Sequence, residues 1–254
     1  MEIKRNDKET YSLTIDNFQK NNYILQTSNN NFYLHKDLSL GTPICRYIPI
    51  EFLIEILSTS KMYISNRQHL NDKREQGIKE DMKYMFHLSP VYRSKKKTLD
   101  EANRISNLHR DAYSSCVSCW TMRTDENIMQ WNCYGHNTCR ISTTIHKLID
   151  SIKNIEKAVI IAPIHYTHIE RTELIEENIF NKHIAYKDEQ EIRLCVLCDE
   201  HHVLFDIKPD VLIDEITLNP FFSKSYRSFL KETMETKFPY LNNKIKFSHL
   251  LEYK

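Results

Sequence analysis

The chain of 254 residues contains only three glycines, at Gly41, Gly77 and Gly135. Average usage of about 7% would supply roughly 18 glycines in a chain of this length. Dinucleotide-binding turns and phosphate-binding loops each need two or three closely spaced glycines, because the backbone must approach the phosphates. Three glycines this far apart cannot form either motif. The sequence therefore excludes the commonest nucleotide-binding folds.

Charge and composition are those of an ordinary globular chain. The 35 Lys and Arg residues nearly balance the 34 Asp and Glu residues, and the net charge of +1 gives no overall attraction to nucleic acid or membranes. Hydrophobic residues make up 41% of the sequence, with 14 Tyr and 11 Phe, which is enough for a sizeable core.

The N-terminal sequence has no apolar stretch typical of a signal peptide. No run approaches the ~18 apolar residues that a membrane span needs. We therefore predict a cytoplasmic protein with no membrane partner. It is predicted to form a single domain over residues 1–254, with residues 1–40 as an N-terminal extension and residues 41–254 as the core.

Seven cysteines, an odd number, favour reduced thiols over a disulfide framework. Cys116 and Cys119 form one Cys-x-x-Cys pair, and Cys195 and Cys198 form another. Both pairs lie in apolar, strand-like runs, where residues three apart point to opposite faces, whereas paired zinc ligands normally sit on tight turns. Two pairs of histidines, His165 with His168 and His201 with His202, have a spacing seen in metal sites. Neither pair has a neighbouring pattern of cysteines or carboxylates that would complete a metal site. We expect buried thiols and no bound metal.

Periodic patterns predict an α+β fold with an antiparallel-rich sheet. Residues 23–25 and 32–34, separated by an Asn-rich turn, are typical of an edge hairpin. Further strands are predicted at residues 44–48, 62–65, 115–121, 159–161, 164–166, 189–198 and 211–218. Helices are predicted after Pro49, where Phe52, Leu53, Ile56 and Leu57 recur at helical spacing, and at residues 73–112, 126–134, 170–182 and 223–238.

The segment from Glu189 to Cys198 has the clearest strand pattern. Its even positions are largely apolar, whereas Glu189, Glu191 and Arg193 share the odd face. One interpretation is an ion-pair ladder on a solvated face. The other is a site in which two close carboxylates raise each other's pKa and perform acid–base work or stabilise a cation. The residues alone leave both interpretations open.

Two further features have a structural and a functional interpretation. Arg46, beside Tyr47 on an apolar strand, needs an anion, because a buried unpaired charge is costly. Its partner could be a protein carboxylate or a ligand diphosphate, which a guanidinium grips with two hydrogen bonds.

Trp120, Trp131 and Tyr134 lie within one short stretch. They could pack in the core or form a stacking wall for a flat heteroaromatic ring.

The order of these motifs resembles a large bacterial family known as a domain of unknown function. The early motifs are Arg46-Tyr47, Glu55-Ile56-Leu57, Tyr63-Ile64-Ser65 and Leu70-Asn71-Asp72. The later motifs are Cys116-Val117-Ser118, Trp131-Asn132-Cys133-Tyr134 and Glu189-Gln190-Glu191-Ile192-Arg193. Two positions depart from the family pattern, because Lys73 stands where proline is usual and Tyr186 where tryptophan is usual.

That family is in turn similar to the ADP-ribosyltransferases, which bind NAD on a split antiparallel sheet without a dinucleotide fingerprint. The resemblance implies a split antiparallel β-sheet core with flanking helices and NAD as cofactor. It implies that Arg46 holds the NAD phosphates or ribose and that Ser118 supports the nicotinamide ribose. The remaining cofactor-binding residues by this resemblance are Tyr47, Asn71, Trp120, Trp131 and Tyr134, with the two tryptophans and Tyr134 as a wall for the nicotinamide.

The same resemblance gives roles to the two glutamates. Glu191 would stabilise the oxocarbenium ion as nicotinamide leaves, and Glu189 would orient or deprotonate the acceptor. The family suggests a toxin or phage-defence effector with an antitoxin or chaperone partner. The basic cluster at residues 93–97 favours RNA or single-stranded DNA over protein as acceptor. The alternatives are a metal-dependent nuclease using Asp72, Glu189 and Glu191, or a non-catalytic interaction domain.

Overall fold

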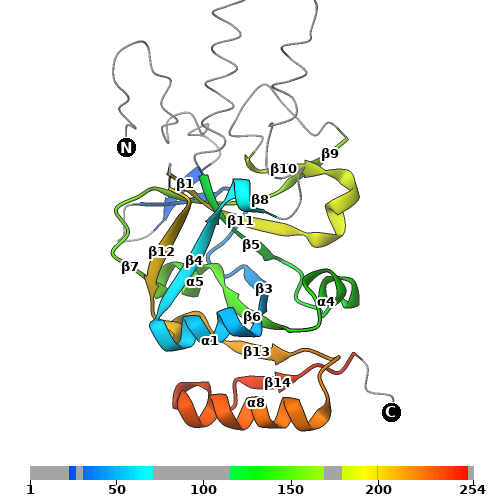
Figure 1. Cartoon of the computed structure of the whole chain (residues 1–254). Helices are drawn as coiled ribbons and strands as arrows, with labels where there is room; N and C mark the ends of the chain where they lie inside the picture. Colours follow the sequence, from blue (N-terminus) through cyan, green and yellow to red (C-terminus); the bar gives the residue numbers. More distant parts are fainter. Residues whose placement is uncertain (1–22, 27–30, 71–114, 169–178, 199, 251–254) are drawn as a thin grey trace, which may run out of the picture.

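The computed structural model (Figure 1) describes residues 23–26, 31–70, 115–168, 179–198 and 200–250. Within these ranges the chain has an α+β fold with a large mixed, mostly antiparallel sheet and several helices. The predicted α+β class is therefore confirmed. Asn71, Asp72, the predicted helix at 73–112 and the basic cluster at 93–97 lie outside the described residues.

The described strands, in chain order, are β1 (Tyr23–Gln26), β2 (Phe32–His35), β3 (Pro43–Pro49), β4 (Lys61–Asn66), β5 (Ser115–Thr121), β6 (Thr138–Thr144), β7 (Ile152–Lys153), β8 (Val159–Pro163), β9 (His165–Thr167), β10 (Asn181–His183), β11 (Glu191–Leu197), β12 (His202–Ile207), β13 (Glu215–Leu218) and β14 (Ile245–Phe247). The described helices are α1 (Ile50–Thr59), α4 (Ile128–Tyr134), α5 (Ile145–Ser151), α7 (Pro209–Leu212) and α8 (Lys224–Lys237), with short 3-10 helices η3 (Arg67–His69), η5 (Ile184–Glu189) and η6 (Pro239–Leu241).

Most strands belong to one sheet with the order β1-β2-β8-β11-β5-β3-β6-β13-β14, and β4, β12 and β7 extend it beside β5. Only the β2–β8 and β13–β14 pairs of the described sheet are parallel. The predicted edge hairpin is confirmed as β1 and β2. Because β2 pairs with β8, this part of the predicted N-terminal extension belongs to the sheet. Strands β9 and β10 form a separate parallel pair near the start of β11 (Figure 1).

The sheet divides at one edge of β5. Strand β11 pairs with the whole length of the other edge. On the dividing edge, Cys45 of β3 pairs with Thr121, whereas Ser65 of β4 pairs with Val117. Strands β3 and β4 therefore leave β5 at opposite ends of this edge, and α1 connects them (Figure 1). The candidate site lies at this division.

Helix α1 begins immediately after β3, because Pro49 lacks the N–H that would continue a strand ladder. Its residues Leu53 and Ile56 are buried in the core. The helix ends where Ser60 adopts a left-handed conformation and donates its N–H to the Ile56 carbonyl at 2.9 Å. Phe52 fits the same helical spacing, but it is 53% exposed and lines the cleft between β3 and β4.

Both faces of β11 are buried, which corrects the expectation of one buried and one charged face. Ile192 and Leu194 pack in the main core, whereas Cys195 packs in a second cluster on the opposite face with Ile179 and Phe180. The segment that leads into β10 thus covers the face that also carries Glu191 and Arg193. These two charged residues are therefore interior groups rather than members of a solvated ladder.

Several other sequence predictions need correction. Glu189 ends η5 instead of starting the strand, because Gln190 adopts a left-handed conformation and turns the chain. Lys182, expected in a helix over 170–182, lies in β10, and residues 169–178 lie outside the described parts. The strand predicted at 211–218 is shorter, since α7 occupies Pro209–Leu212.

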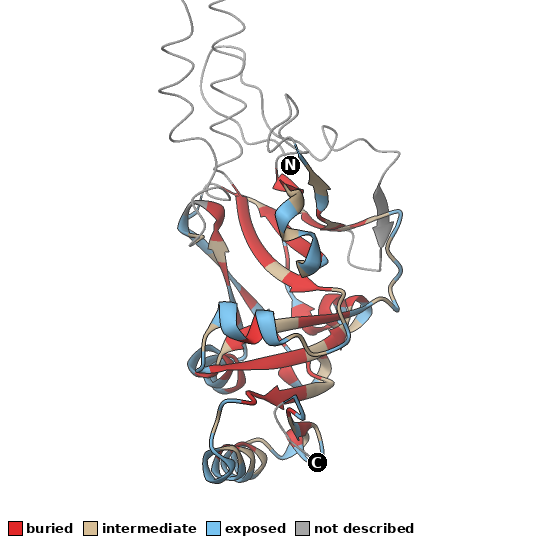
Figure 2. Ribbon diagram, turned by 90° about the vertical axis from the view of Figure 1, so that its right-hand side faces the viewer, coloured by how far each residue is buried: buried red, intermediate tan, exposed pale blue. Residues whose placement is uncertain are grey.

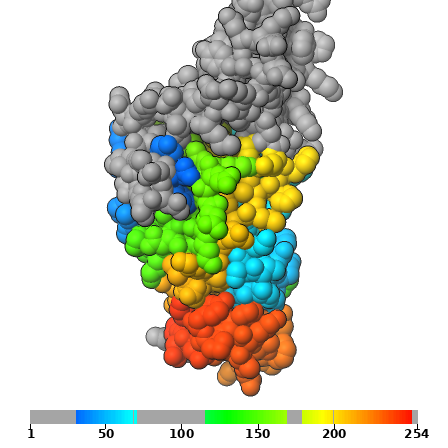
Figure 3. Space-filling view, turned by 90° about the vertical axis from the view of Figure 1, so that its left-hand side faces the viewer, coloured from blue at the N-terminus to red at the C-terminus, as the bar shows by residue number. Residues whose placement is uncertain are grey.

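The C-terminal helix α8 packs at one end of the molecule beside β14 (Figures 1 and 3). Ser223 caps it by accepting a hydrogen bond from the Tyr226 N–H, and Leu230 and Met234 are its buried residues. The strands are largely buried, whereas the outer surfaces of α1 and α8 are exposed (Figure 2). None of the described helices has the length and apolar content required to cross a bilayer.

Candidate functional site

A cleft of about 950 Å³ lies where the sheet divides. Its lining comes from β3, α1, β4, β5, α4 and β10, together with the two glutamates near the start of β11. The cleft therefore brings together residues from positions 45 to 204 of the chain. A volume of this size is at the upper end of the range for small-molecule and cofactor sites.

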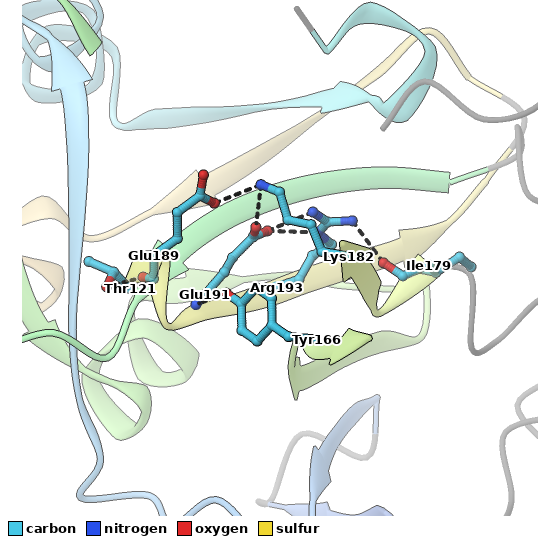
Figure 4. Close-up of polar contacts among 7 residues, drawn as sticks. All are labelled: Thr121, Tyr166, Ile179, Lys182, Glu189, Glu191 and Arg193. Carbon is cyan, nitrogen blue, oxygen red and sulfur yellow. Dashed lines mark hydrogen bonds and ion pairs between the residues drawn. The ribbon is translucent and has the colours of Figure 1, made fainter. Parts of the chain in front are cut away.

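Glu191 is the most enclosed carboxylate of the cleft, with only 4% of its side chain exposed. Its Oε1 atom accepts a hydrogen bond from Nε of Arg193 at 2.8 Å and forms an ion pair with Nη2 of the same residue at 2.8 Å. Its Oε2 atom lies 3.3 Å from Nζ of Lys182. Arg193 also donates to the Ile179 carbonyl at 2.8 Å, which fixes the guanidinium in the interior. Glu191 is thus a buried carboxylate held between two cations (Figure 4).

Glu189 is brought to the same point by a different route. Its carbonyl accepts a hydrogen bond from the Thr121 hydroxyl at 2.7 Å, which anchors the end of η5 to β5. Its side chain is 38% exposed, and Oε2 lies 2.6 Å from Nζ of Lys182. Figure 4 shows both carboxylates turned toward this ammonium group. The two carboxylates therefore lie close together, as predicted. Their shared contact with Lys182 brings them together, and not the alternation of side chains along one strand.

Two opposing effects set the pKa of Glu191. Burial by itself raises the pKa, because it disfavours the charged carboxylate. The positive charges of Arg193 and Lys182 and a hydrogen bond from Cys119 lower it, and the net pKa lies below the ordinary glutamate value. Glu191 is therefore ionised at neutral pH. The pKa of Tyr166, whose hydroxyl oxygen accepts the Glu191 N–H at 2.8 Å, is raised by burial to about 12.

Arg46 lies on the β3 side of the cleft and is half-buried. Its guanidinium carbon lies 5.9 Å from the centre of the Trp120 ring, a cation–π contact. Among the described residues, no hydrogen bond or ion pair connects this guanidinium to another group. The first interpretation of Arg46, a protein carboxylate as its partner, thus finds no such partner among the described residues. The Arg46 guanidinium remains available to an anion in the cleft.

The predicted aromatic residues separate into two groups. Trp120, Tyr47 and Tyr134 line the cleft, and Tyr134 stacks on Tyr47 with ring centres 5.7 Å apart. Trp120 and Tyr47 are only 3% and 4% exposed, so Tyr134, at 49%, is the most accessible ring of the three, and Trp131 is fully buried. It packs edge-on against Tyr47 at 4.7 Å, and its Nε1 donates to Glu126. Trp131 therefore supports the wall from behind and does not belong to it, because α4 turns this position into the core.

Ser118 does not lie where the resemblance implies. Ser118 is not among the residues that line the cleft, whereas its β5 neighbours Val117 and Cys119 are. Ser118 is 1% exposed and accepts a hydrogen bond from Nε1 of Trp120 at 3.0 Å. It positions the indole ring and does not contact the cleft.

The cysteines follow the predicted alternation. Cys116 is buried in the main core, 3.3 Å from the sulfur of Cys198, whereas Cys119 faces the cleft. All seven cysteines are free thiols. No cluster of three or more potential metal ligands occurs among the described residues.

Sequence reasoning did not assign a role to several groups that line the cleft. Lys182 gives no signal in the sequence, because it lies in a short polar stretch and its carboxylate partners are defined only by the fold. Three other residues that line the cleft could have been found in the sequence. Tyr63 and Ser65 belong to the Tyr63-Ile64-Ser65 motif, and Phe52 belongs to the helical pattern after Pro49; the rings of Phe52 and Tyr63 are exposed. No protein-family model matches the chain, and a search of curated proteins finds none with significant similarity.

Proposed function

We propose that the cleft binds NAD and that the protein transfers ADP-ribose from it to a macromolecule. The observation that carries the proposal is the arrangement of charge in one cleft. Arg46, without a carboxylate partner among the described residues, lies beside aromatic rings, and the Glu189–Glu191 pair lies on the other side. A diphosphate fits the guanidinium fork, and a flat ring fits the aromatic wall. The cleft lies where the sheet divides at β5.

In the proposed reaction, the bond between nicotinamide and the ribose C1′ breaks, and its electron pair leaves with nicotinamide. The positive charge that develops on the ribose is stabilised by the ionised Glu191. Arg193 fixes Oε1, and Oε2, which accepts one hydrogen bond from Lys182 at 3.3 Å, has further lone-pair capacity for a ribose hydroxyl. A nucleophile of the acceptor then forms a bond to C1′ and transfers its proton to the more exposed Glu189. A preorganised charge of this kind contributes about 3–4 kcal/mol to catalysis.

The nuclease alternative receives less support from the same geometry. A divalent cation between Glu189 and Glu191 would occupy the place that the Lys182 ammonium group takes. Asp72, the third ligand of that hypothesis, lies outside the described residues. The carboxylate pair thus already has two cations of the protein, Lys182 and Arg193, as counterions.

The acceptor and the biological role remain part of the proposal. RNA or single-stranded DNA is favoured over protein by the cationic cluster at residues 93–97, which would contact phosphates without reading sequence. A toxin or phage-defence effector, restrained by an antitoxin or chaperone, is the role that the resemblance suggests.

The test incubates the purified protein with NAD labelled on the adenylate phosphate, and with RNA, single-stranded DNA or cell protein in parallel. We expect nicotinamide release and label on nucleic acid, and neither with Glu191→Gln. Label on protein alone, unaffected by neutralising residues 93–97, would reject the nucleic-acid acceptor. Absence of nicotinamide release with every acceptor would reject the transferase, and magnesium-dependent cleavage of nucleic acid without NAD would favour the nuclease.

A further inference from the structure

Lys182 lies at the point where the two cleft carboxylates meet. Its side chain is 8% exposed, and its Nζ contacts Oε2 of Glu189 at 2.6 Å and Oε2 of Glu191 at 3.3 Å. Nζ also lies 4.6 Å from the centre of the Tyr186 ring, which covers the ammonium group. We propose that Lys182 is a positioning residue that holds Glu189 and Glu191 as one ionised pair, so that Glu189 can accept the acceptor's proton. This inference rests on the proposed function.

The need for such a residue follows from the fold. Glu189 and Glu191 belong to different elements, and the left-handed Gln190 between them turns the chain. The Thr121 hydroxyl anchors the carbonyl of Glu189 but not its carboxylate. A glutamate side chain that is 38% exposed has rotamer freedom that a contact with an ammonium group reduces. The ammonium group restricts it to the orientation in which its carboxylate meets that of Glu191.

Arg193 cannot take over this task from its position. It binds Oε1 of Glu191, on the side of the carboxylate away from Lys182, and the main chain of Ile179. The two cations therefore divide the Glu191 carboxylate between them, one for each oxygen. In the contacts described here, Lys182 is the cation that also reaches Glu189.

Other titratable groups face the pair from each neighbouring element. Cys119 from β5 and Tyr166 from β9 contact Glu191, and Tyr134 from α4 lies close enough to interact with both carboxylates. Burial raises the pKa values of Tyr134 and Tyr166, so both hydroxyls are neutral at neutral pH. Removal of Lys182 would take away the cation that contacts both carboxylates. Arg193 contacts Glu191 and would keep that carboxylate ionised. Repulsion from the ionised Glu191 would then raise the pKa of Glu189.

The first test follows the glutamate carboxylates by ¹³C NMR during a pH titration without NAD, with Glu189→Gln used to assign the Glu189 signal. In Lys182→Met we expect the titration midpoint of Glu189 to rise by about one pH unit or more. Lys182→Arg is expected to restore it, since a guanidinium can bridge two carboxylates. Lys147→Met is the control, because Lys147 pairs with Asp214 away from the cleft. An unchanged midpoint in folded Lys182→Met would overturn the proposal, and Lys182→Gln gives the same readout if the methionine variant does not fold.

The second test separates binding from turnover. In Lys182→Met we expect NAD affinity within about twofold of the parent protein, because Arg46 is untouched, and an ADP-ribose transfer rate lower by ~10². The acidic limb of the rate profile should shift to higher pH together with the NMR midpoint. A shifted NMR midpoint with normal transfer would reject the positioning role alone. No nicotinamide release from the parent protein would instead reject the proposed function, because the NMR titration needs no NAD.

Discussion

The two walls of the cleft handle charge in opposite ways. On the wall formed by β10 and β11, Glu191 and Arg193 are almost completely buried, and together with Lys182 they satisfy one another. On the wall formed by β3, Arg46 lies over the Trp120 ring with no ion pair to any described residue. The first wall is electrostatically complete without a ligand, whereas the second has a positive charge without a counterion. In the function we propose, the anionic part of the ligand lies at the β3 wall and the reacting part at the carboxylate wall.

We expect the largest effect on stability from removing the buried ion pair between Glu191 and Arg193. Arg193→Met removes one partner of a buried ion pair and leaves Lys182 as the cation in contact with Glu191. Loss of one partner of a buried pair costs about 3–5 kcal/mol, and we expect a decrease of this size in the unfolding free energy measured with denaturant. Lys147→Met, which breaks the more exposed pair with Asp214, should change it by about 1 kcal/mol or less. Equal losses of unfolding free energy in both variants would contradict the claim that the buried charges beside β10 and β11 stabilise the protein more than an exposed ion pair.

Glu191→Gln keeps the shape of the side chain and removes its charge. If Glu191 stabilises a developing positive charge, nicotinamide release should slow by ~10²–10³, or about 3–4 kcal/mol in the activation free energy. Stability should also fall, because two cations lose their shared anion. Glu189→Gln is the matched control for stability, since its more exposed pair contributes about 1 kcal/mol or less. Near-normal turnover in folded Glu191→Gln would remove this residue from the mechanism.

The complete wall also predicts how stability depends on pH. The pKa of Glu191 is lower in the folded protein than its ordinary value, so the stabilisation it provides is fully present above the unfolded pKa of about 4.3. That stabilisation is lost as the pH falls through the lower, folded pKa. The difference in unfolding free energy between the parent protein and Glu191→Gln should therefore be constant from pH 5 to 7 and shrink below pH 4. A difference that grows on acidification would contradict this sign.

Local patterns predicted those parts of the fold that depend on neighbouring residues. The apolar run of β5, the helical spacing of α1 and the capped helix α8 were all predictable, because short-range sequence patterns define them. The sequence did not indicate β6 or β12, in which polar residues interrupt the alternation. It also missed the break at Glu189, which depends on the left-handed Gln190.

The candidate site was predictable only as residue types. Glu189, Glu191 and Arg46 do line one cleft, because strands far apart in sequence meet at the division of the sheet. The sequence could not indicate that Lys182 bridges the glutamates, since that contact depends on how β10 packs beside β11. It could not separate Trp120 from Trp131 either, because the orientation of α4 decides which ring reaches the cleft.

Calorimetric titration of NAD into the parent protein and into Arg46→Lys tests the contrast between the two walls most directly. A lysine keeps the charge but loses the two-pronged fork that grips a diphosphate, so we expect binding at least about tenfold weaker. The unfolding free energy should change little, because no ion pair to a described residue is lost. NAD binding that is absent from the parent protein, or equally tight in Arg46→Lys, would contradict the account. A large loss of stability with unchanged affinity would make Arg46 a structural residue and leave the β3 wall without a ligand.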